Sequence, residues 1–380
     1  NGLVAEIQFY KKLLVKVGIK PEFIQFKEFK SPEQYTRINM SQSIRSMMKS
    51  ILEDMQVRFI KAVSNDRKIK ESVLHEVINI GIINASEAAE LKLVDAVGYR
   101  HQVQDRLAKD TGRLQYKGMP ARNYLESARS RKSSQGPRIA LIGATGLITS
   151  GKSDYFGQTL GGSSMAEILL EIRKSKKYDA VLLRINSPGG SAVGSDMIWQ
   201  EVQLLEKSDI PVIVSMSGVA GSGGYYIAMA ASKIISHAST ITGSIGVIFG
   251  KFDLSGLYEL VGINTDRVKI SPNADLLSSS TSLSPKQREA ITSWVQTIYN
   301  RFVSKAASGR EMEFGQLEAK ARGRIYTGEQ ARAIGLVDDI GGFEKAVEHI
   351  RAELNLKKDS PIQLILLPKS KGFWETFTDL

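Results

Sequence analysis

The sequence predicts an α/β fold built from two tandem repeats, of which the first is incomplete. In the second half of the chain, apolar β-branched runs end in glycine-rich turns and lead into segments with apolar residues at helical spacing. This strand–turn–helix order is typical of α/β proteins. Blocks of sequence also recur about 244 residues apart. A chain of 380 residues, 42% of them hydrophobic, can bury two cores.

The first informative element is the run 178–186, Tyr-Asp-Ala-Val-Leu-Leu-Arg-Ile-Asn, which predicts a buried strand. It leads into the turn 187–191, Ser-Pro-Gly-Gly-Ser, and then into a segment with apolar residues at helical spacing: Met197, Ile198, Val202 and Leu205. A Pro-Gly-Gly turn before a helix directs consecutive N–H donors at one point, which can hold a phosphate or a tetrahedral oxyanion. No lysine follows the glycines, so the turn is not a GxxxxGK[ST] phosphate loop.

The second element places a serine among glycines after a strand. The apolar run 211–215 predicts the strand, and 217–226 reads Ser-Gly-Val-Ala-Gly-Ser-Gly-Gly-Tyr-Tyr, with a helix expected over 225–231. Ser222 would then lie at a helix N-terminus, where unpaired N–H groups favour developing negative charge. The neighbouring glycines let a substrate backbone approach closely. This arrangement is typical of a nucleophile, although a lone Gly-Ser-Gly is also compatible with a tight buried turn.

The third element is the segment 239–249, which is strand-like and interrupted by Gly243-Ser244. The order along the chain is therefore strand–SPGG–helix, strand–GSGG–helix and strand–TGSIG. Residues 211–232 contain no charge and are long enough to raise the question of a transmembrane helix. Pro211 and four glycines favour a buried strand plus a buried helix instead.

An internal repeat connects the two halves of the chain. Three pairs of segments match at a nearly constant spacing of 243 to 244 residues: 13–18 with 257–262, 93–98 with 336–341, and the long helical segments 41–63 with 284–306. Such a constant period indicates a duplicated domain.

The repeat predicts four regions. Residues 1–127 form the C-terminal part of the first repeat, 128–137 a polar linker, 138–356 the complete second repeat, and 357–380 a C-terminal tail. The first repeat has no counterparts of the SPGG and GSGG segments, and the chain begins at Asn1. We therefore expect a fragment or processed chain.

The ordered motifs resemble the signal peptide peptidase A family of serine proteases, in its long duplicated form. The resemblance covers nearly the whole chain and implies a ClpP/crotonase-like spiral of ββα units. It implies Ser222 as the nucleophile, and Gly189, Gly190 and Gly223 as the oxyanion-binding positions.

A serine nucleophile needs a base. There are four histidines, and His237 lies nearest to the motifs, but the position of the catalytic histidine of ClpP falls near Ser244. A histidine triad is therefore not expected. A lysine kept neutral by burial is the alternative. The resemblance puts this base on Lys30, in the first repeat, and implies that Ser244 orients it. Shorter single-repeat relatives take both residues from one repeat, which would point to Lys269.

The resemblance implies a Ser-Lys endopeptidase that degrades cleaved signal peptides or other extended apolar peptides through an acyl-enzyme, without a cofactor. It also implies homotetramers associated with a membrane, either the bacterial inner membrane facing the periplasm or a thylakoid membrane. Two other functions remain open. An acyl-CoA enzyme on the same fold would have no use for Ser222 or Lys30, and a non-catalytic membrane scaffold would tolerate loss of Ser222.

Composition limits the other possibilities. The absence of cysteine excludes disulfides and thiol catalysis, and no histidine spacing suggests a metal site. The net charge of +11 belongs mainly to residues 1–136, which carry +9. Opposite charges alternate there, as on solvated helices, and no motif suggests nucleic acid. A solvated surface is the simplest interpretation, and an anionic membrane surface is the expected partner if the charge has one.

Overall fold

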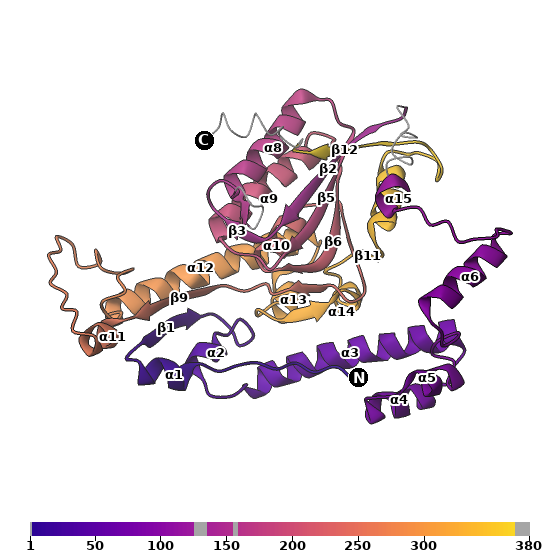
Figure 1. Cartoon of the computed structure of the whole chain (residues 1–380). Coiled ribbons are helices and arrows are strands. Elements are labelled where there is room, and N and C mark those ends of the chain that lie inside the picture. Colours follow the sequence, from indigo (N-terminus) through magenta and orange to yellow (C-terminus); the bar gives the residue numbers. More distant parts are fainter. Residues whose placement is uncertain (1, 125–134, 155–158, 369–380) are drawn as a thin grey trace. The chain divides into compact units, whose positions relative to one another are not determined.

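The computed structural model describes residues 2–124, 135–154 and 159–368 (Figure 1). It divides into two compact units: residues 1–5 with 50–134, and residues 6–49 with 135–380. The division does not follow the predicted repeat boundary, because residues 6–49 fold with the second half of the chain. The predicted linker 128–137 falls mostly outside the described residues.

An eight-stranded sheet forms the centre of the larger unit. Its main path runs β10-β8-β6-β5-β2-β12, with β7 paired to β6 and β11 paired to β7. The strands are β2 (Arg138–Thr145), β5 (Ala180–Ser187), β6 (Val212–Gly221), β7 (Lys233–Ser236), β8 (Ile241–Gly243), β10 (Ile325–Thr327), β11 (Asp339–Ile340) and β12 (Gln363–Leu367). All pairs except β10–β8 are parallel. The predicted α/β class is therefore confirmed.

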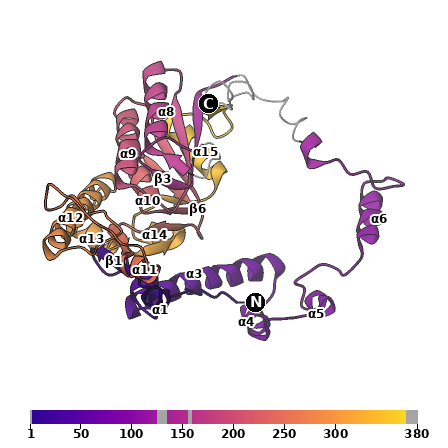
Figure 2. The same cartoon turned by 60° about the vertical axis from the view of Figure 1, so that its left-hand side comes forward.

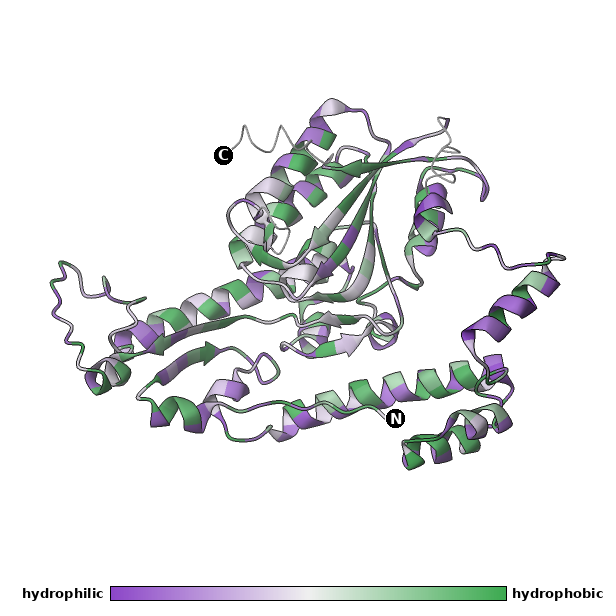
Figure 3. Cartoon of the chain, in the orientation of Figure 1, coloured by the Kyte–Doolittle hydropathy of each residue, from purple (hydrophilic) through white to green (hydrophobic). Residues whose placement is uncertain are grey.

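Helices cover both faces of this sheet (Figures 1 and 2). One face carries α8 (Gly162–Ser175), α9 (Ala192–Glu206), α10 (Gly223–Ala228) and part of α12 (Pro285–Gly309), which form the main core with the strands. The other face packs against α15 (Phe343–Glu353). Because both faces are covered, the parallel strands β2, β5 and β6 are mainly apolar, as the hydropathy colouring shows (Figure 3).

The predicted elements around the motifs are present with shifted ends. The strand expected over 178–186 is β5, and the strand expected from Pro211 is β6, which continues to Gly221. The helix expected over 225–231 is α10, which begins directly after Ser222. The segment 239–249 forms two strands, β8 and β9 (Ile248–Asp253), separated by Ser244. These boundaries put the predicted site residues at strand ends, in turns or, for Gly223, at the first position of α10.

Two small sheets complete the surroundings of the motifs. Strand β1 (Lys20–Gln25) pairs antiparallel with β9, and β3 (Leu147–Thr149) pairs parallel with β4 (Thr159–Gly161). The first pair joins the segment that carries Lys30 to the second half of the chain. The β1–β9 ladder is the reason why residues 6–49 belong to the larger unit.

The remaining helices of the larger unit are short. They are α1 (Lys11–Lys16), α2 (Glu33–Thr36), α11 (Ser255–Leu260), α13 (Phe314–Lys320) and α14 (Gly328–Ala333). The smaller unit contains most of α3 (Gln42–Arg67), together with α4 (Glu71–Ile80), α5 (Ala85–Glu90) and α6 (Arg100–Asp110). A small cluster around Ile60, Ile69 and Leu74 is the core of the smaller unit.

The helices of the first half recur in the second half at the predicted spacing. Shifted by 243 positions, α5 and α6 have the same bounds as α14 and α15. The capping boxes recur as well, since Asn84 with Glu87 corresponds to Thr327 with Gln330. A capping box depends on the local sequence, so these matches support the predicted duplication.

Two further features concern the ends of the chain and its apolar helices. The region 357–380, predicted as a tail, contributes β12 to the edge of the sheet, where it pairs with β2. Among the described residues, none of the helices has both the length and the apolar character needed to cross a bilayer.

Candidate active site

Ser222 lies in a strained turn between β6 and α10. Its φ of 54° and ψ of −118° are rare for a residue with a side chain. The turn is held by a hydrogen bond from the Ser222 N–H to the carbonyl of Gly243 (2.9 Å). A side chain at Gly224 would put its Cβ 2.6 Å from the Ser187 carbonyl oxygen. Gly224 is therefore required, because it packs closely against the end of β5.

The Pro-Gly-Gly turn after β5 packs directly against this serine. A Cβ on Gly189 would lie 2.5 Å from the Gly223 nitrogen and 2.7 Å from the Ser222 Cβ. Gly189 and Gly190 have φ values of 101° and 149°, which only glycine adopts easily. The two glycine-rich turns that the sequence singled out are thus neighbours in space.

The N–H groups of these turns differ in their partners. The Gly189 N–H donates to Ser187 Oγ (3.1 Å), so it is already used within the turn. Strand β3 forms a bridge to Gly190 through the two residues that flank it. The Ile148 N–H donates to the Gly189 carbonyl, and the Ser191 N–H donates to the Ile148 carbonyl. The Gly190 N–H makes no hydrogen bond within the described part of the chain. As the first residue of α10, Gly223 also lacks a helical acceptor.

Lys30 and Ser244 come from distant parts of the sequence and meet in the fold. Lys30 follows β1, and Ser244 follows β8 with a φ of 53°. The Lys30 Nζ donates to Ser244 Oγ at 2.8 Å. Lys30 keeps some exposure as a residue, but its amine is buried, and this burial lowers the pKa of Lys30 from 10.5 to about 8. An appreciable fraction of this amine is therefore neutral near physiological pH.

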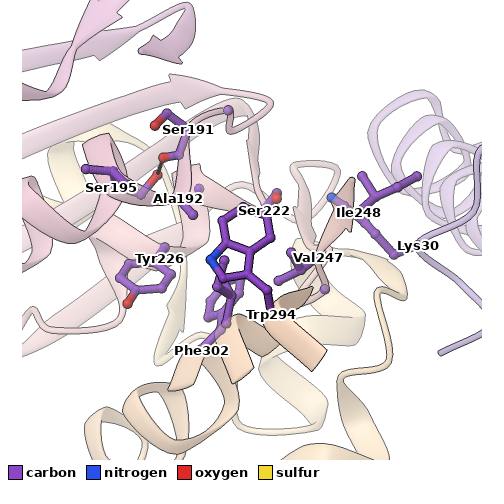
Figure 4. Close-up of a pocket in the computed structure, with 15 residues that line it drawn as sticks. Lys30, Ser191, Ala192, Ser195, Ser222, Tyr226, Val247, Ile248, Trp294 and Phe302 are labelled. Carbon is purple, nitrogen blue, oxygen red and sulfur yellow. Dashed lines mark hydrogen bonds between the residues drawn. The ribbon is translucent and has the colours of Figure 1, made fainter. Parts of the chain in front are cut away.

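Lys30 and Ser222 line the same cavity, which has a volume of about 370 Å³ (Figure 4). Figure 4 shows the amine end of Lys30 directed toward the side of the cavity where Ser222 lies. Most of the remaining wall is apolar: Ala192, Val193, Val247, Ile248, Trp294, Ile298 and Phe302. The cavity therefore combines a serine, a buried amine and an apolar wall.

The comparisons with known proteins identify the family of this chain. The profile of Peptidase family S49 matches residues 1–113 and 205–357, and that of Clp protease matches 158–242. The chain belongs to Peptidase family S49. The Clp protease match also confirms the predicted ClpP-like fold.

Curated members and relatives of this family are similar over most of the chain. Serine protease SPPA, chloroplastic, of Arabidopsis thaliana is 33% identical over 97% of this chain and 56% of its own length. Protease 4 of Salmonella typhi is 31% identical over 94% of this chain and 59% of its own length. The putative signal peptide peptidase SppA of Enterococcus faecium is 33% identical over 63% of this chain and 71% of its own length. This chain thus spans somewhat over half the length of its two longer relatives.

A solved structure, a ClpP1 mutant from Listeria monocytogenes, aligns with 55% of this chain and 94% of its own, at 16% identity and a TM-score of 0.37.

The two alternative bases lie elsewhere in this S49 chain. Lys269 pairs with Asp275 (3.2 Å) on an exposed segment. His237 is exposed between β7 and β8. Neither residue lines the cavity that contains Ser222.

Sequence reasoning did not identify the apolar wall on α12. Trp294, Ile298 and Phe302 follow one another at intervals of four residues, so they lie on one face of the helix. That spacing was visible in the sequence, but it is also typical of an ordinary core helix. Only the position of α12 beside the Ser222 turn makes these residues part of the cavity.

A second cluster joins three helices at the side of the cavity. Tyr226 donates from its hydroxyl to Asp196 Oδ1 (2.6 Å), and Lys305 forms an ion pair with the same carboxylate. Burial, followed by the hydrogen bond to Asp196, raises the pKa of Tyr226. Lys305 also lies over the Trp199 ring, 3.5 Å from its centroid. The cluster connects α9, α10 and α12, and so stabilises the wall of the cavity.

Proposed function

We propose that this protein is a serine endopeptidase in which Ser222 is the nucleophile and Lys30 the general base. The observation that carries the proposal is the buried Lys30 amine, hydrogen-bonded to Ser244 and lining the same cavity as Ser222. Its pKa of about 8 matches what a general base needs near neutral pH. Ser244 holds the amine in position, as the third member of a catalytic triad does.

The reaction proceeds in two halves. The neutral Lys30 amine takes the proton from Ser222 Oγ, which attacks the peptide carbonyl, and the resulting ammonium then protonates the leaving amine. An acyl-enzyme remains on Ser222. Lys30, neutral again, removes a proton from water, which attacks the ester and releases the acid. The proton returns to Ser222 at the end of the cycle.

The oxyanion is held by the N–H groups of Gly190 and Gly223. Both lack another acceptor among the described residues, and removal of one such donor costs about 3 kcal/mol in known hydrolases. Gly189 was expected to contribute as well, but its N–H donates to Ser187 Oγ. The proposal therefore assigns Gly189 to the packing of the two turns against each other.

The substrate is an extended apolar peptide, such as the hydrophobic part of a cleaved signal peptide. The apolar wall formed by Trp294, Ile298 and Phe302 supports this substrate class. The name of the Enterococcus faecium relative, a putative signal peptide peptidase, supports the same class.

The protein assembles with copies of itself, as a homotetramer, and acts at a membrane of the bacterial periplasm or of the thylakoid. One observation supports self-association. Strand β1 pairs with β9, but its counterpart one repeat later, residues 264–269, forms no ladder within the described residues. An exposed segment without a strand partner is available to a second copy. Light scattering of the purified protein measures the assembly.

A fluorophosphonate probe tests the proposed function. We expect it to modify Ser222, as identified by mass spectrometry of the labelled peptide, and we expect Ser222→Ala to abolish labelling. Half-buried Ser217 provides the matched control, because Ser217→Ala removes a hydroxyl five residues earlier, outside the cavity. If the folded wild-type protein is not labelled, the peptidase proposal is wrong, and a scaffold or acyl-CoA function takes its place.

A further inference from the structure

The turn between α13 and β10, residues 321–324, contacts both partners of the Lys30–Ser244 hydrogen bond. The Phe29 N–H donates to the Arg322 carbonyl (3.1 Å), and the Ser244 N–H donates to the Arg324 carbonyl (2.7 Å). Between them, the Gly323 N–H donates to the carbonyl of Ile245 (2.8 Å). Three backbone hydrogen bonds from one short turn therefore reach the residue before the lysine, the serine itself and the residue after the serine.

Gly323 lies directly against the backbone of Lys30. A Cβ at Gly323 would be 2.4 Å from both the nitrogen and the Cβ of Lys30, and the φ of Gly323 is +82°. Gly246 approaches the same place from the other side, since its Cβ would be 2.7 Å from the Gly323 Cα and 2.9 Å from the Lys30 Cβ. Only glycines at these two positions allow the three segments to pack this closely.

The charged groups near Lys30 are engaged with partners other than Lys30. On its own loop, Glu28 pairs with Arg322 (3.1 Å), and Lys27 pairs with Glu318 (2.9 Å). Arg324 lies over the Phe29 ring. Along the cavity, Tyr226 is the other titratable residue of the lining. Burial, and none of these charges, is the cause of the lowered pKa of Lys30.

We propose that the turn 321–324 is the element that positions the base, with Gly323 as a positioning residue that holds Lys30 against Ser244 and inside the cavity. The proposal rests on the proposed function, because it assigns a role in setting the state of the general base. Gly323 does not line the cavity and touches no substrate.

Displacing Lys30 has a definite consequence for the reaction. A lysine that moves toward solvent regains hydration, and its pKa rises toward 10.5. Each unit by which the pKa of Lys30 rises lowers the neutral fraction of its amine at pH 7 about tenfold. The loss of rate should therefore be large at neutral pH and shrink at high pH, whereas a loss of folded protein lowers the rate equally at every pH.

Gly323→Ala tests this inference through the pH dependence of Ser222 labelling and of peptide cleavage. We expect labelling to be at least tenfold slower at pH 7, with most of the loss recovered near pH 10, a lower kcat and a KM within about twofold. The matched control is Gly262→Ala, where φ is +78° but no atom lies within 4 Å of the added Cβ. It carries the same backbone strain without the contact to Lys30, so its pH profile should remain that of the wild type.

Gly246→Ala keeps the inference testable if Gly323→Ala does not fold. It presses on the same contact from the side of Ser244 and should shift the pH profile in the same direction. If a folded variant at either position loses rate equally at all pH values, or loses none, the positioning role is wrong. Absence of labelling in the wild-type protein would instead refute the proposed function, so the two failures are distinguishable.

Discussion

Residues 42–110 and 285–353 contain the same helices, but they differ in what covers them. In both regions an arginine at the end of the long helix bonds a carbonyl and an aspartate: Arg67 with Lys92 and Asp95, and Arg310 with Gly335 and Asp338. The spacing between each pair of equivalents is 243 residues (67 to 310). The same set of hydrogen bonds from an arginine thus occurs in both regions.

The environment of this arrangement is not the same. The Asp95 side chain is 88% exposed and that of Asp338 is 24% exposed, because Asp338 also accepts from the Ile234 N–H of β7. On α15, Ile350 is fully buried against the sheet, whereas its counterpart Leu107 on α6 is 44% exposed. The comparison teaches that local sequence is enough to form and cap these helices, while burial depends on the sheet.

The largest expected effect concerns the lysines contributed by the two repeats. Lys30→Ala should lower the rate of peptide cleavage by about 10² to 10⁴-fold, because the general base is lost. Lys269→Ala should leave the rate within about twofold, because Lys269 is exposed and paired with Asp275. Rates are measured on variants with an unchanged circular dichroism spectrum. The reverse result would move the base into the second repeat.

The next effect compares equivalent apolar positions on α15 and α6. Ile350→Ala should lower the free energy of unfolding by about 2 to 5 kcal/mol, because it leaves a cavity beneath the sheet. Leu107→Ala should change it by less than about 1 kcal/mol, because much of that side chain already contacts water. Urea unfolding of the two variants provides the measurement. Similar losses at both positions would mean that α6 is covered in solution.

The repeated ion pair allows the same comparison for charge. Asp338→Asn should destabilise the protein by about 2 kcal/mol, because Arg310 is buried and would lose its charged partner. Asp95→Asn should have an effect within about 0.5 kcal/mol, as exposed ion pairs usually do. Thermal unfolding at low and high salt separates the two, since only the exposed pair is strongly screened.

The smallest effect concerns how the buried Lys30 changes the stability of the folded protein. In the folded protein the pKa of Lys30 is about 8, below its ordinary value of 10.5. Between these values the unfolded chain binds a proton that the folded chain lacks, so stability rises with pH. Lys30→Met should therefore stabilise the protein at pH 7 by about 1 to 2 kcal/mol. The difference in stability between the variant and the wild type should narrow toward pH 10.5. For Lys269→Met we expect no such difference.

Much of the candidate site could be predicted from local patterns. The turns at 187–191 and 217–226 were recognised because their glycines and their position after apolar runs are properties of short segments. The apolar wall on α12 was missed, because helical spacing alone does not say what a helix faces. It was equally hidden that the Gly189 N–H has an acceptor and the Gly190 N–H has none among the described residues, since this depends on Ser187 Oγ and on the bridge to β3.

By itself, the sequence determined the α/β class, the helix caps of both repeats, and the two glycine-rich turns at 187–191 and 217–226. These features depend on propensities and hydrogen bonds between residues close along the chain. Only the tertiary structure decided that Lys30 donates to Ser244, 214 residues away, and that its amine is buried. Burial depends on every segment that packs around the amine, and the turn at Gly323, distant from both residues in sequence, is one of them.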